Sequence, residues 1–383
     1  MSNTLIDQIL REWPPGYGGV ERVAHELACT WGGTVYSLDA QTLALEEQDV
    51  LTVGYPRKVL LRTWPIGRFV LPLPSRCLWG LLRSTRPLHG HLPSPGVLLV
   101  LLLAKLMRPE RKVSAHWHFF LHPEWSLKGV FFTVYQWFAL SQMNRLSMVV
   151  TTSPVLAQSL IQSGCRSDKV HVLPCCLSDE QERNGLMVPL RESGERDPLR
   201  VLFIGRLDSY KRLDWLLHSL ARLKTPWTLN VVGDGPRRMV FEDLSHQLFR
   251  DQSVCFHGRV DEATKQMHLA AADVLVLPSD RCNEAFGIVQ LEAMASGIPS
   301  LAFECERSGM AWVCRLPSLV WPQTQSTLHE ALEMLAVDPV FRQELGRQSR
   351  ERYLKLFSRS IWSKERQRLS RSESIESGYV SSI

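Results

Sequence analysis

"RVLFIGRLDSYKRLDWLL" (Arg200–Leu217) has three parts that together indicate how this 383-residue chain folds. An apolar run ends in a glycine, a short polar loop follows, and a helical pattern begins near Leu213. A short apolar run closed by glycine is typical of a buried strand. A strand followed by a loop and a helix is the unit from which parallel α/β sheets are built.

The same alternation continues through the second half of the chain. The predicted strands are Arg200–Gly205, Thr228–Gly233, Val254–Gly258, Asp273–Ser279 and Ile298–Phe303. The predicted helices between them are Leu213–Leu223, Pro236–Phe249, Glu262–Ala271 and Phe286–Ser296. The first half gives weaker signals of the same kind, with strands at Leu5–Leu10, Lys112–His118 and Met148–Ser153 and a helix in "GGVERVAHELACTW". The fold class is therefore α/β, with two parallel-sheet domains.

A charged stretch without periodicity separates the two halves. We expect a first domain over residues 1–178, a linker over 179–199 and a second domain over 200–355. A helix over 356–370 is expected to pack back on the first domain, and the serine-rich residues 371–383 are expected to be disordered.

Composition restricts the kinds of partner. The net charge of +5 favours anionic substrates or an anionic membrane surface, and is too weak to indicate nucleic acid. Nine cysteines without a C-x-x-C pair indicate reduced thiols and a cytoplasmic protein. The opening residues lack a secretory signal, and the longest apolar run, Gly96–Met107, is too short to span a bilayer. We expect that run to be a buried helix, and any membrane contact to be peripheral, at the inner face of the cytoplasmic membrane.

Loops at the carboxyl ends of parallel strands carry the ligand sites of open α/β sheets. Arg206 and Lys211 follow the first strand of the second half, where they could hold a polyanion or could form an ordinary solvated basic turn. Gly233 and Gly235 follow the next strand and permit close backbone approach.

The segment "EAFGIVQLE" (Glu284–Glu292) follows the fourth strand. A sugar diphosphate would fit it, with sugar hydroxyls on Glu284, phosphate at the helix start near Gly287, and ribose hydroxyls on Glu292. The alternative is an amphipathic helix with two surface carboxylates. The Arg–Lys pair two loops earlier favours the ligand site.

Two histidine pairs lie in the first half, in "HGHLP" (His89 and His91) and "HWH" (His116 and His118). Alternate residues of a strand share a face, so each pair could ligate a metal. No cysteine or carboxylate completes either pair, and we predict no metal. Buried, hydrogen-bonded histidine is the alternative for each ring.

These motifs resemble family 4 of the retaining glycosyltransferases, which have the GT-B fold of two Rossmann-like domains facing across a cleft. The matching pieces are "GRLDSYK", "VVGDGP", "FHGRVDEATK", "ADVLVLPS" and "EAFGIVQLEAMASGIPSLA", with "PPGYGGVERVAHELA", "LHGHLPSP" and "SAHWHFF" in the first half. The spacing is most similar to bacterial mannosyltransferases that act on phosphatidylinositol.

The resemblance implies roles for individual residues. Arg206 and Lys211 would hold the diphosphate, and Glu284 would bind the donor sugar. His91 would sit beside the reacting sugar, with His116 as a second candidate. The other donor contacts would come from Gly18, Gly19, Gly205, Gly233, Val260, Glu262, Lys265, Phe286, Gly287, Ile288 and Glu292.

A carboxylate at the position of Glu262 contacts guanine in the similar enzymes, so a GDP-sugar, with GDP-mannose favoured, is expected over a UDP-sugar. No cofactor or metal is implied. The expected reaction is transfer of a hexose, by front-face attack with retention, to a lipid-linked or polysaccharide acceptor of the cell envelope. The alternatives are a nucleotide-sugar epimerase of the same fold, a non-catalytic scaffold and a Rossmann dehydrogenase, for which the G-x-G-x-x-G fingerprint is missing.

Overall fold

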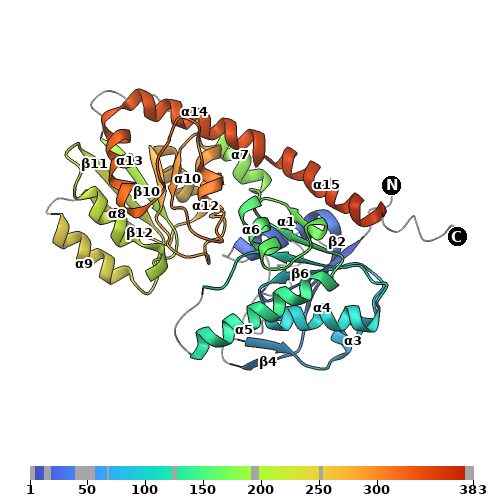
Figure 1. Cartoon of the computed structure of the whole chain (residues 1–383). Helices are drawn as coiled ribbons and strands as arrows, with labels where there is room; N and C mark the ends of the chain where they lie inside the picture. Colours follow the sequence, from blue (N-terminus) through green and yellow to red (C-terminus); the bar gives the residue numbers. More distant parts are fainter. Residues whose placement is uncertain are drawn as a thin grey trace. The chain divides into compact units, whose positions relative to one another are not determined.

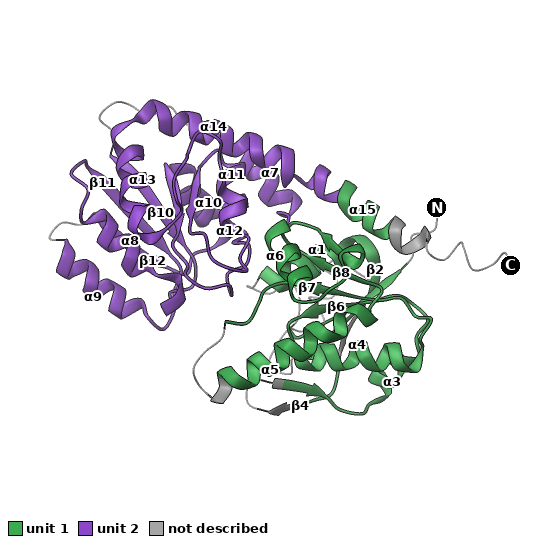
Figure 2. Ribbon diagram, in the orientation of Figure 1, with its two compact units in different colours: residues 1–174, 364–383 green, residues 175–363 purple. Residues whose placement is uncertain are grey.

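The computed structural model of the chain describes residues 5–12, 19–38, 57–66, 69–122, 127–190, 198–249 and 253–375. It divides into two compact units (Figure 2). Unit 1 comprises Met1–Pro174 and Lys364–Ile383, and unit 2 comprises Cys175–Ser363. Each unit is built on its own parallel sheet, so the predicted fold class of two α/β units is confirmed.

Unit 1 has a seven-stranded sheet in the order β3-β2-β1-β6-β7-β8-β9, and every neighbouring pair is parallel. The strands are β1 (Ile6–Leu10), β2 (Gly32–Ser37), β3 (Arg57–Leu60), β6 (Leu88–Leu92), β7 (Val113–Trp117), β8 (Met148–Thr151) and β9 (Val170–Val172). A separate antiparallel hairpin joins β4 (Thr63–Ile66) to β5 (Phe69–Pro72).

The helices of unit 1 are α1 (Gly19–Trp31), α3 (Arg76–Arg83), α4 (Pro95–Met107), α5 (Leu127–Gln142) and α6 (Pro154–Gln162), with short 3₁₀ turns η1 (Met143–Arg145) and η2 (Ser167–Lys169) (Figure 1). Local sequence explains where α6 begins, because the side chain of Ser153 accepts a hydrogen bond from Leu156 N and Pro154 occupies the first helical turn. Helix α4 is the apolar run expected to be buried. It buries only one side, and Leu106 at its end is 77% exposed.

Unit 2 has a five-stranded parallel sheet in the order β12-β11-β10-β13-β14. The strands are β10 (Leu199–Ile204), β11 (Trp227–Val232), β12 (Val254–Gly258), β13 (Val274–Leu277) and β14 (Ser300–Ala302). Both faces of β10 are covered. Val201 and Phe203 pack into one apolar cluster and Leu202 into another, as expected for alternate residues of a central strand.

The helices of unit 2 are α7 (Asp179–Met187), α8 (Leu213–Leu220), α9 (Arg238–Leu248), α10 (Glu262–Ala271), α11 (Val289–Ala295), α12 (Met310–Cys314), α13 (Gln325–Val337) and α14 (Pro339–Leu356), with the 3₁₀ turn η3 (Ser209–Lys211). Helix α15 (Arg359–Ile375) continues from unit 2 into the part of the chain grouped with unit 1. Among the described helices, none combines the length and the apolar character needed to cross a membrane.

The expected linker over residues 179–199 is wrong in its first half, which forms α7. The side chain of Ser178 accepts from Gln181 N while the Gln181 side chain accepts from Ser178 N, and this reciprocal cap fixes the helix start. The expected disorder over 371–383 is also wrong at its start, because α15 runs to Ile375. Residues 376–383 lie outside the described residues.

Candidate nucleotide-sugar site

The first group of site residues lies where β10 and β13 end, at the carboxyl edge of the unit 2 sheet. Lys211 is buried, and its ammonium donates to the carboxylate of Glu284. Burial is the largest single influence and disfavours the charged form, but Glu284, Tyr210 and Asp208 together outweigh burial and raise the pKa of Lys211. Arg206 is different: its side chain is 69% exposed and pairs with Asp208 at 2.8 Å. The structure thus joins two of the predicted residues and leaves a cation open to solvent beside the same strand end.

The turn that carries Lys211 has an unusual backbone. Arg212 has φ 49°, in the left-handed region, which a non-glycine residue adopts only at a conformational cost. Its guanidinium pairs with Asp214 at 2.7 Å and Asp280 at 3.3 Å, and lies 3.8 Å from the centre of the Trp215 ring. These contacts hold the turn in place and therefore position Lys211.

Side-chain hydrogen bonds from neighbouring segments hold the loop that carries Glu284 in place. The Ser308 hydroxyl donates to the Glu284 carbonyl at 2.6 Å. The buried side-chain amide of Gln290 donates to the Phe286 carbonyl at 2.8 Å, and Ser300 donates to the Gln290 oxygen at 3.0 Å. Gly287 has φ 69°, which explains why a glycine stands between the two glutamates.

The predicted start of the helix after this loop needs correction. Helix α11 begins at Val289, with Ile288 as its N-cap, and not near Phe286. The backbone of 284–287 is bent by the positive φ of Gly287 and is not helical. Phe286 is buried against Trp312 and Phe357, so the described contacts of its ring are with the protein interior.

The glycines at the ends of β10 and β11 pack against each other. A Cβ on Gly233, which has φ 130°, would lie 2.0 Å from the Gly205 carbonyl oxygen. A Cβ on Gly235 would lie 2.5 Å from the Leu207 carbonyl oxygen. The close approach predicted at Gly233 and Gly235 is therefore to the loop that follows β10, on either side of Arg206.

A second charged group lies between α10 and α11. Lys265 pairs with Glu292 at 2.7 Å and with Glu262 at 2.9 Å. The side-chain amide of Gln181, on α7, donates to the same two carboxylates at 3.4 and 3.0 Å. Glu262 is half exposed, whereas Glu292 is nearly buried. Val260, at the end of the preceding loop, packs against the apolar cluster beneath.

Asp261, which precedes Glu262, has a structural role. Its side chain caps α10 by accepting from Thr264 N at 2.7 Å. Hydrogen bonding to the Thr264 side chain, and then to its backbone N–H, lowers the pKa of Asp261. Of the two acidic residues in the loop, Glu262 alone has its carboxylate turned to the charged group.

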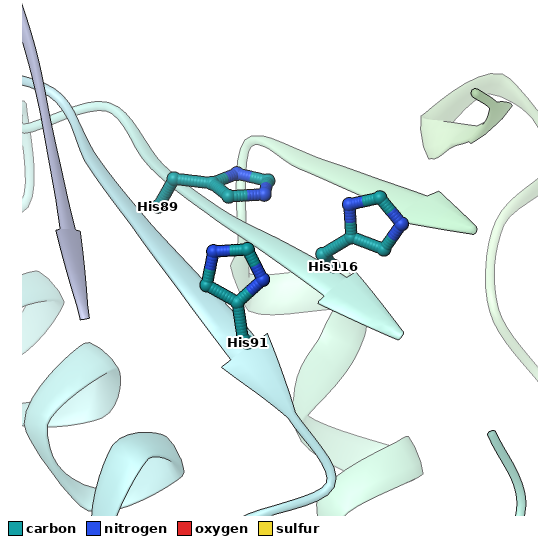
Figure 3. A group of neighbouring side chains, drawn as sticks. All are labelled: His89, His91 and His116. Atoms are coloured by element: carbon teal, nitrogen blue, oxygen red, sulfur yellow. The ribbon is translucent and has the colours of Figure 1, made fainter. Parts of the chain in front are cut away.

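The unit 1 residues differ from expectation. Gly18 lies outside the described residues, and Gly19 is the first residue of α1. His91 and His116 were expected beside the reacting sugar, but they lie inside β6 and β7 and are buried, because both segments form central strands of the sheet. Burial lowers the pKa of both rings. Figure 3 shows His89, His91 and His116 turned toward one another from the two strands.

His118 was considered from the sequence only as half of a possible metal-binding pair, and its contact with His91 was missed. It directly follows β7, and its Nε2 lies 2.9 Å from His91 Nδ1, while His91 Nε2 lies 2.9 Å from Gln8 Oε1. Because an amide oxygen only accepts, His91 donates to Gln8 and its Nδ1 accepts from His118. The H-x-H spacing placed His116 and His118 on one face, but only pairing with β6 reveals this chain of contacts. Arg212, Asp280, Ser308 and Gln181 were also missed.

Two family models match the two halves of the chain. A model described as "Glycosyltransferase Family 4" matches residues 17–181, and one described as "Glycosyl transferases group 1" matches residues 198–336.

Similar proteins agree with these matches. An uncharacterized glycosyltransferase of Methanocaldococcus jannaschii is 38% identical over 105 residues, which are 27% of this chain and 26% of the relative. D-rhamnosyltransferase WbpZ of Pseudomonas aeruginosa is 30% identical over 164 residues, 42% of each chain. The matches thus cover less than half of these relatives. HepE of Anabaena, solved in complex with UDP, aligns with a TM-score of 0.72 at 18% identity, over 97% of this chain and 99% of HepE.

The two parallel-sheet units and this full-length structural likeness define a protein of the GT-B class. With glycosyltransferase models matching both halves, the chain belongs to the glycosyltransferases.

Proposed function

We propose that the protein is a hexosyltransferase that uses a nucleotide diphosphate sugar as donor. The observation that carries this proposal is the Lys211–Glu284 pair, buried beside the exposed Arg206 where β10 and β13 end. A carboxylate that can accept from sugar hydroxyls and two cations that can face a diphosphate are the groups that donor cleavage requires.

In the proposed reaction the diphosphate leaves with its electron pair, and negative charge grows on the oxygen that was bonded to the sugar. Arg206 and Lys211 stabilise that charge, which is largest in the transition state. Glu284 orients the sugar through its hydroxyls. Since its carboxylate is already committed to Lys211, we assign it no nucleophilic role. We propose retention by front-face attack, with the leaving phosphate accepting the proton of the acceptor.

The second charged group is proposed to bind the nucleoside. Glu292 would accept from ribose hydroxyls in place of its present partners, Lys265 and Gln181. Glu262 is the carboxylate within this group that a base can reach, and guanine offers it two adjacent donors where uracil offers one. We therefore propose a GDP-sugar, GDP-mannose in the first place, as for the mannosyltransferases that the sequence resembles. UDP, which HepE was solved with, is the competing nucleotide.

The acceptor is proposed to be lipid-linked. Helix α5 exposes an apolar face of five large side chains, with Trp137 71%, Val130 60% and Val134 58% exposed and Phe131 and Phe138 beside them. Among the described residues of this face none is charged. Arg76, Trp79 and Arg83 are exposed on α3. Aromatic, apolar and basic side chains in this combination suit peripheral contact with an anionic membrane, where such an acceptor would lie.

Titration calorimetry tests the donor site. A nucleoside diphosphate should bind at one site per chain, about tenfold or more tighter than the matching monophosphate, because the second phosphate meets the cations. Arg206→Ala should remove most of that difference. Equal affinities for the two nucleotides in the wild type would refute a diphosphate site at Arg206.

A further inference from the structure

Four histidines and a serine share one face of the unit 1 sheet. His89 and His91 alternate along β6, and Ser114, His116 and His118 alternate along β7 and its end. The two strands pair with His89 opposite Ser114 and His91 opposite His116. One ring nitrogen each of His89, His91 and His116 lies within 4.8 Å of the other two (Figure 3).

The rings of this cluster hold unpaired polar atoms deep in the unit. Within the described part of the chain, His89 Nε2 and both ring nitrogens of His116 have no hydrogen-bond partner, and both residues are at most 1% exposed. Buried nitrogens are rarely left unpaired, since losing water without replacement is costly. A small cavity adjoins these two rings, and Leu27, Trp31 and Met148 also line it. A ligand bound between these rings would account for both the unpaired nitrogens and the cavity.

The outer contacts resemble those of metal-binding histidines, whose second ring nitrogen usually donates to an oxygen. Ser114 Oγ lies 2.8 Å from His89 Nδ1 and can accept its proton, which leaves a lone pair on Nε2. Gln8 Oε1 accepts from His91 Nε2 in the same way, which leaves a lone pair on Nδ1.

We propose that His89, His91 and His116 form a binding site for one divalent d-block cation, with Zn²⁺ as the probe. Imidazole nitrogen suits Zn²⁺, and tetrahedral ligands about 2.1 Å from the ion lie about 3.4 Å apart. The ligand nitrogens, now within 4.8 Å of one another, must therefore approach by up to about 1.4 Å. The cation would take the place of the proton that His118 now shares with His91 Nδ1. Such a site would tie β6 to β7 and would serve structure, independently of the proposed transfer reaction.

The test is the metal content of the protein purified without a polyhistidine tag from cells grown with added Zn²⁺, so that the ion can enter during folding. We expect about one zinc per chain for a single buried site. His116→Gln and His89→Gln should each lower the content at least tenfold. The matched control is His257→Gln with His268→Gln, a pair of neighbouring histidines on unit 2 whose loss should leave the zinc content unchanged.

The visible absorption spectrum of wild-type protein from cells grown with Co²⁺ is a second test. It does not require that any variant folds. Tetrahedral nitrogen ligation should give intense visible absorption bands, and His116→Gln should abolish them where it folds. Wild-type protein without bound metal, a six-coordinate Co²⁺ spectrum, or full metal content in folded His116→Gln would each overturn the proposal. Nucleotide binding in wild type and variants separates this outcome from a failure of the proposed function.

Discussion

Arg206 and Lys211 follow the same strand, but their surroundings require different tests. The Arg206 side chain is 69% exposed and forms an ion pair with Asp208, whereas Lys211 is buried against Glu284. Removing an exposed pair changes stability little. Loss of Arg206 should therefore affect the reaction without affecting the stability of the fold.

We expect Arg206→Ala to lower transfer about 30-fold or more, because a cation facing a leaving diphosphate contributes ~2–4 kcal/mol to the transition state. The melting temperature should stay at the wild-type value. Arg347→Ala, which removes an exposed, paired arginine of α14, is the matched control and should leave the rate unchanged. A wild-type rate in Arg206→Ala would remove this residue from the site.

Lys211 gives a different prediction, because it is buried against Glu284 and its loss should affect the fold as well as the reaction. Lys211→Met leaves Glu284 without its partner and should lower the free energy of unfolding by about 3 kcal/mol. Lys211→Met combined with Glu284→Gln should recover most of that stability while activity stays lost. Urea unfolding measures the first effect and donor turnover the second. A double variant that regains activity would mean that the pair is purely structural.

At the scale of elements, the histidines of β6 and β7 predict an acid sensitivity. Burial holds the pKa of His89, His91, His116 and His118 below the ordinary value, so each ring is neutral when folded and takes up a proton on unfolding in mild acid. Above about pH 6.5 these rings do not lower the free energy of unfolding. Below that pH the free energy of unfolding falls by up to about 1.4 kcal/mol per pH unit for each ring. Urea unfolding with chelator present, between pH 7 and pH 5, measures this slope. His116→Phe should make it shallower, and an unchanged slope would contradict the assignment.

The exposed apolar face of α5 leads us to expect that the protein binds membranes. Val134→Glu and Trp137→Glu place charge on its apolar face and should each weaken binding to vesicles of anionic phospholipid at least fivefold, since a charged group resists burial at the interface. Met239→Glu, on an exposed site of α9 in unit 2, is the control. Sedimentation with vesicles gives the bound fraction. Equal binding by all four proteins would exclude α5 as the contact.

Glu262, at the start of α10, leads to a prediction about the base of the donor nucleotide. If Glu262 pairs with both guanine donors, GDP should bind about tenfold or more tighter than UDP, because losing one buried partner costs ~1–3 kcal/mol. Glu262→Gln should reduce that preference without affecting the contribution of the diphosphate. Calorimetry with GDP and UDP decides the matter, and tighter UDP in the wild type would reject the guanine assignment.

At the scale of the whole molecule, the sequence was sufficient for the sheet of unit 2, but it predicted only three strands of the seven-stranded sheet of unit 1 and only part of the site. Apolar runs such as Val201–Ile204 depend on neighbouring residues alone, and they predicted the strands of unit 2. The partners of Lys265 and His91 lie on other elements, and no local pattern encodes them. Helix α7 could have been found from Ser178 and Gln181, whose spacing is that of a capping box. The burial of His91 could not, because it follows from the order of strands in the sheet.

The most direct measurement is release of nucleoside diphosphate from a panel of nucleotide sugars, with and without a lipid-linked acceptor. The account predicts slow release from at least one hexose donor, GDP-mannose first, faster release with the correct acceptor, and loss of both with Arg206→Ala. Folded protein that releases no nucleoside diphosphate from any donor would contradict the account. Conversion of a nucleotide sugar to its epimer, without net release, would identify an epimerase in its place.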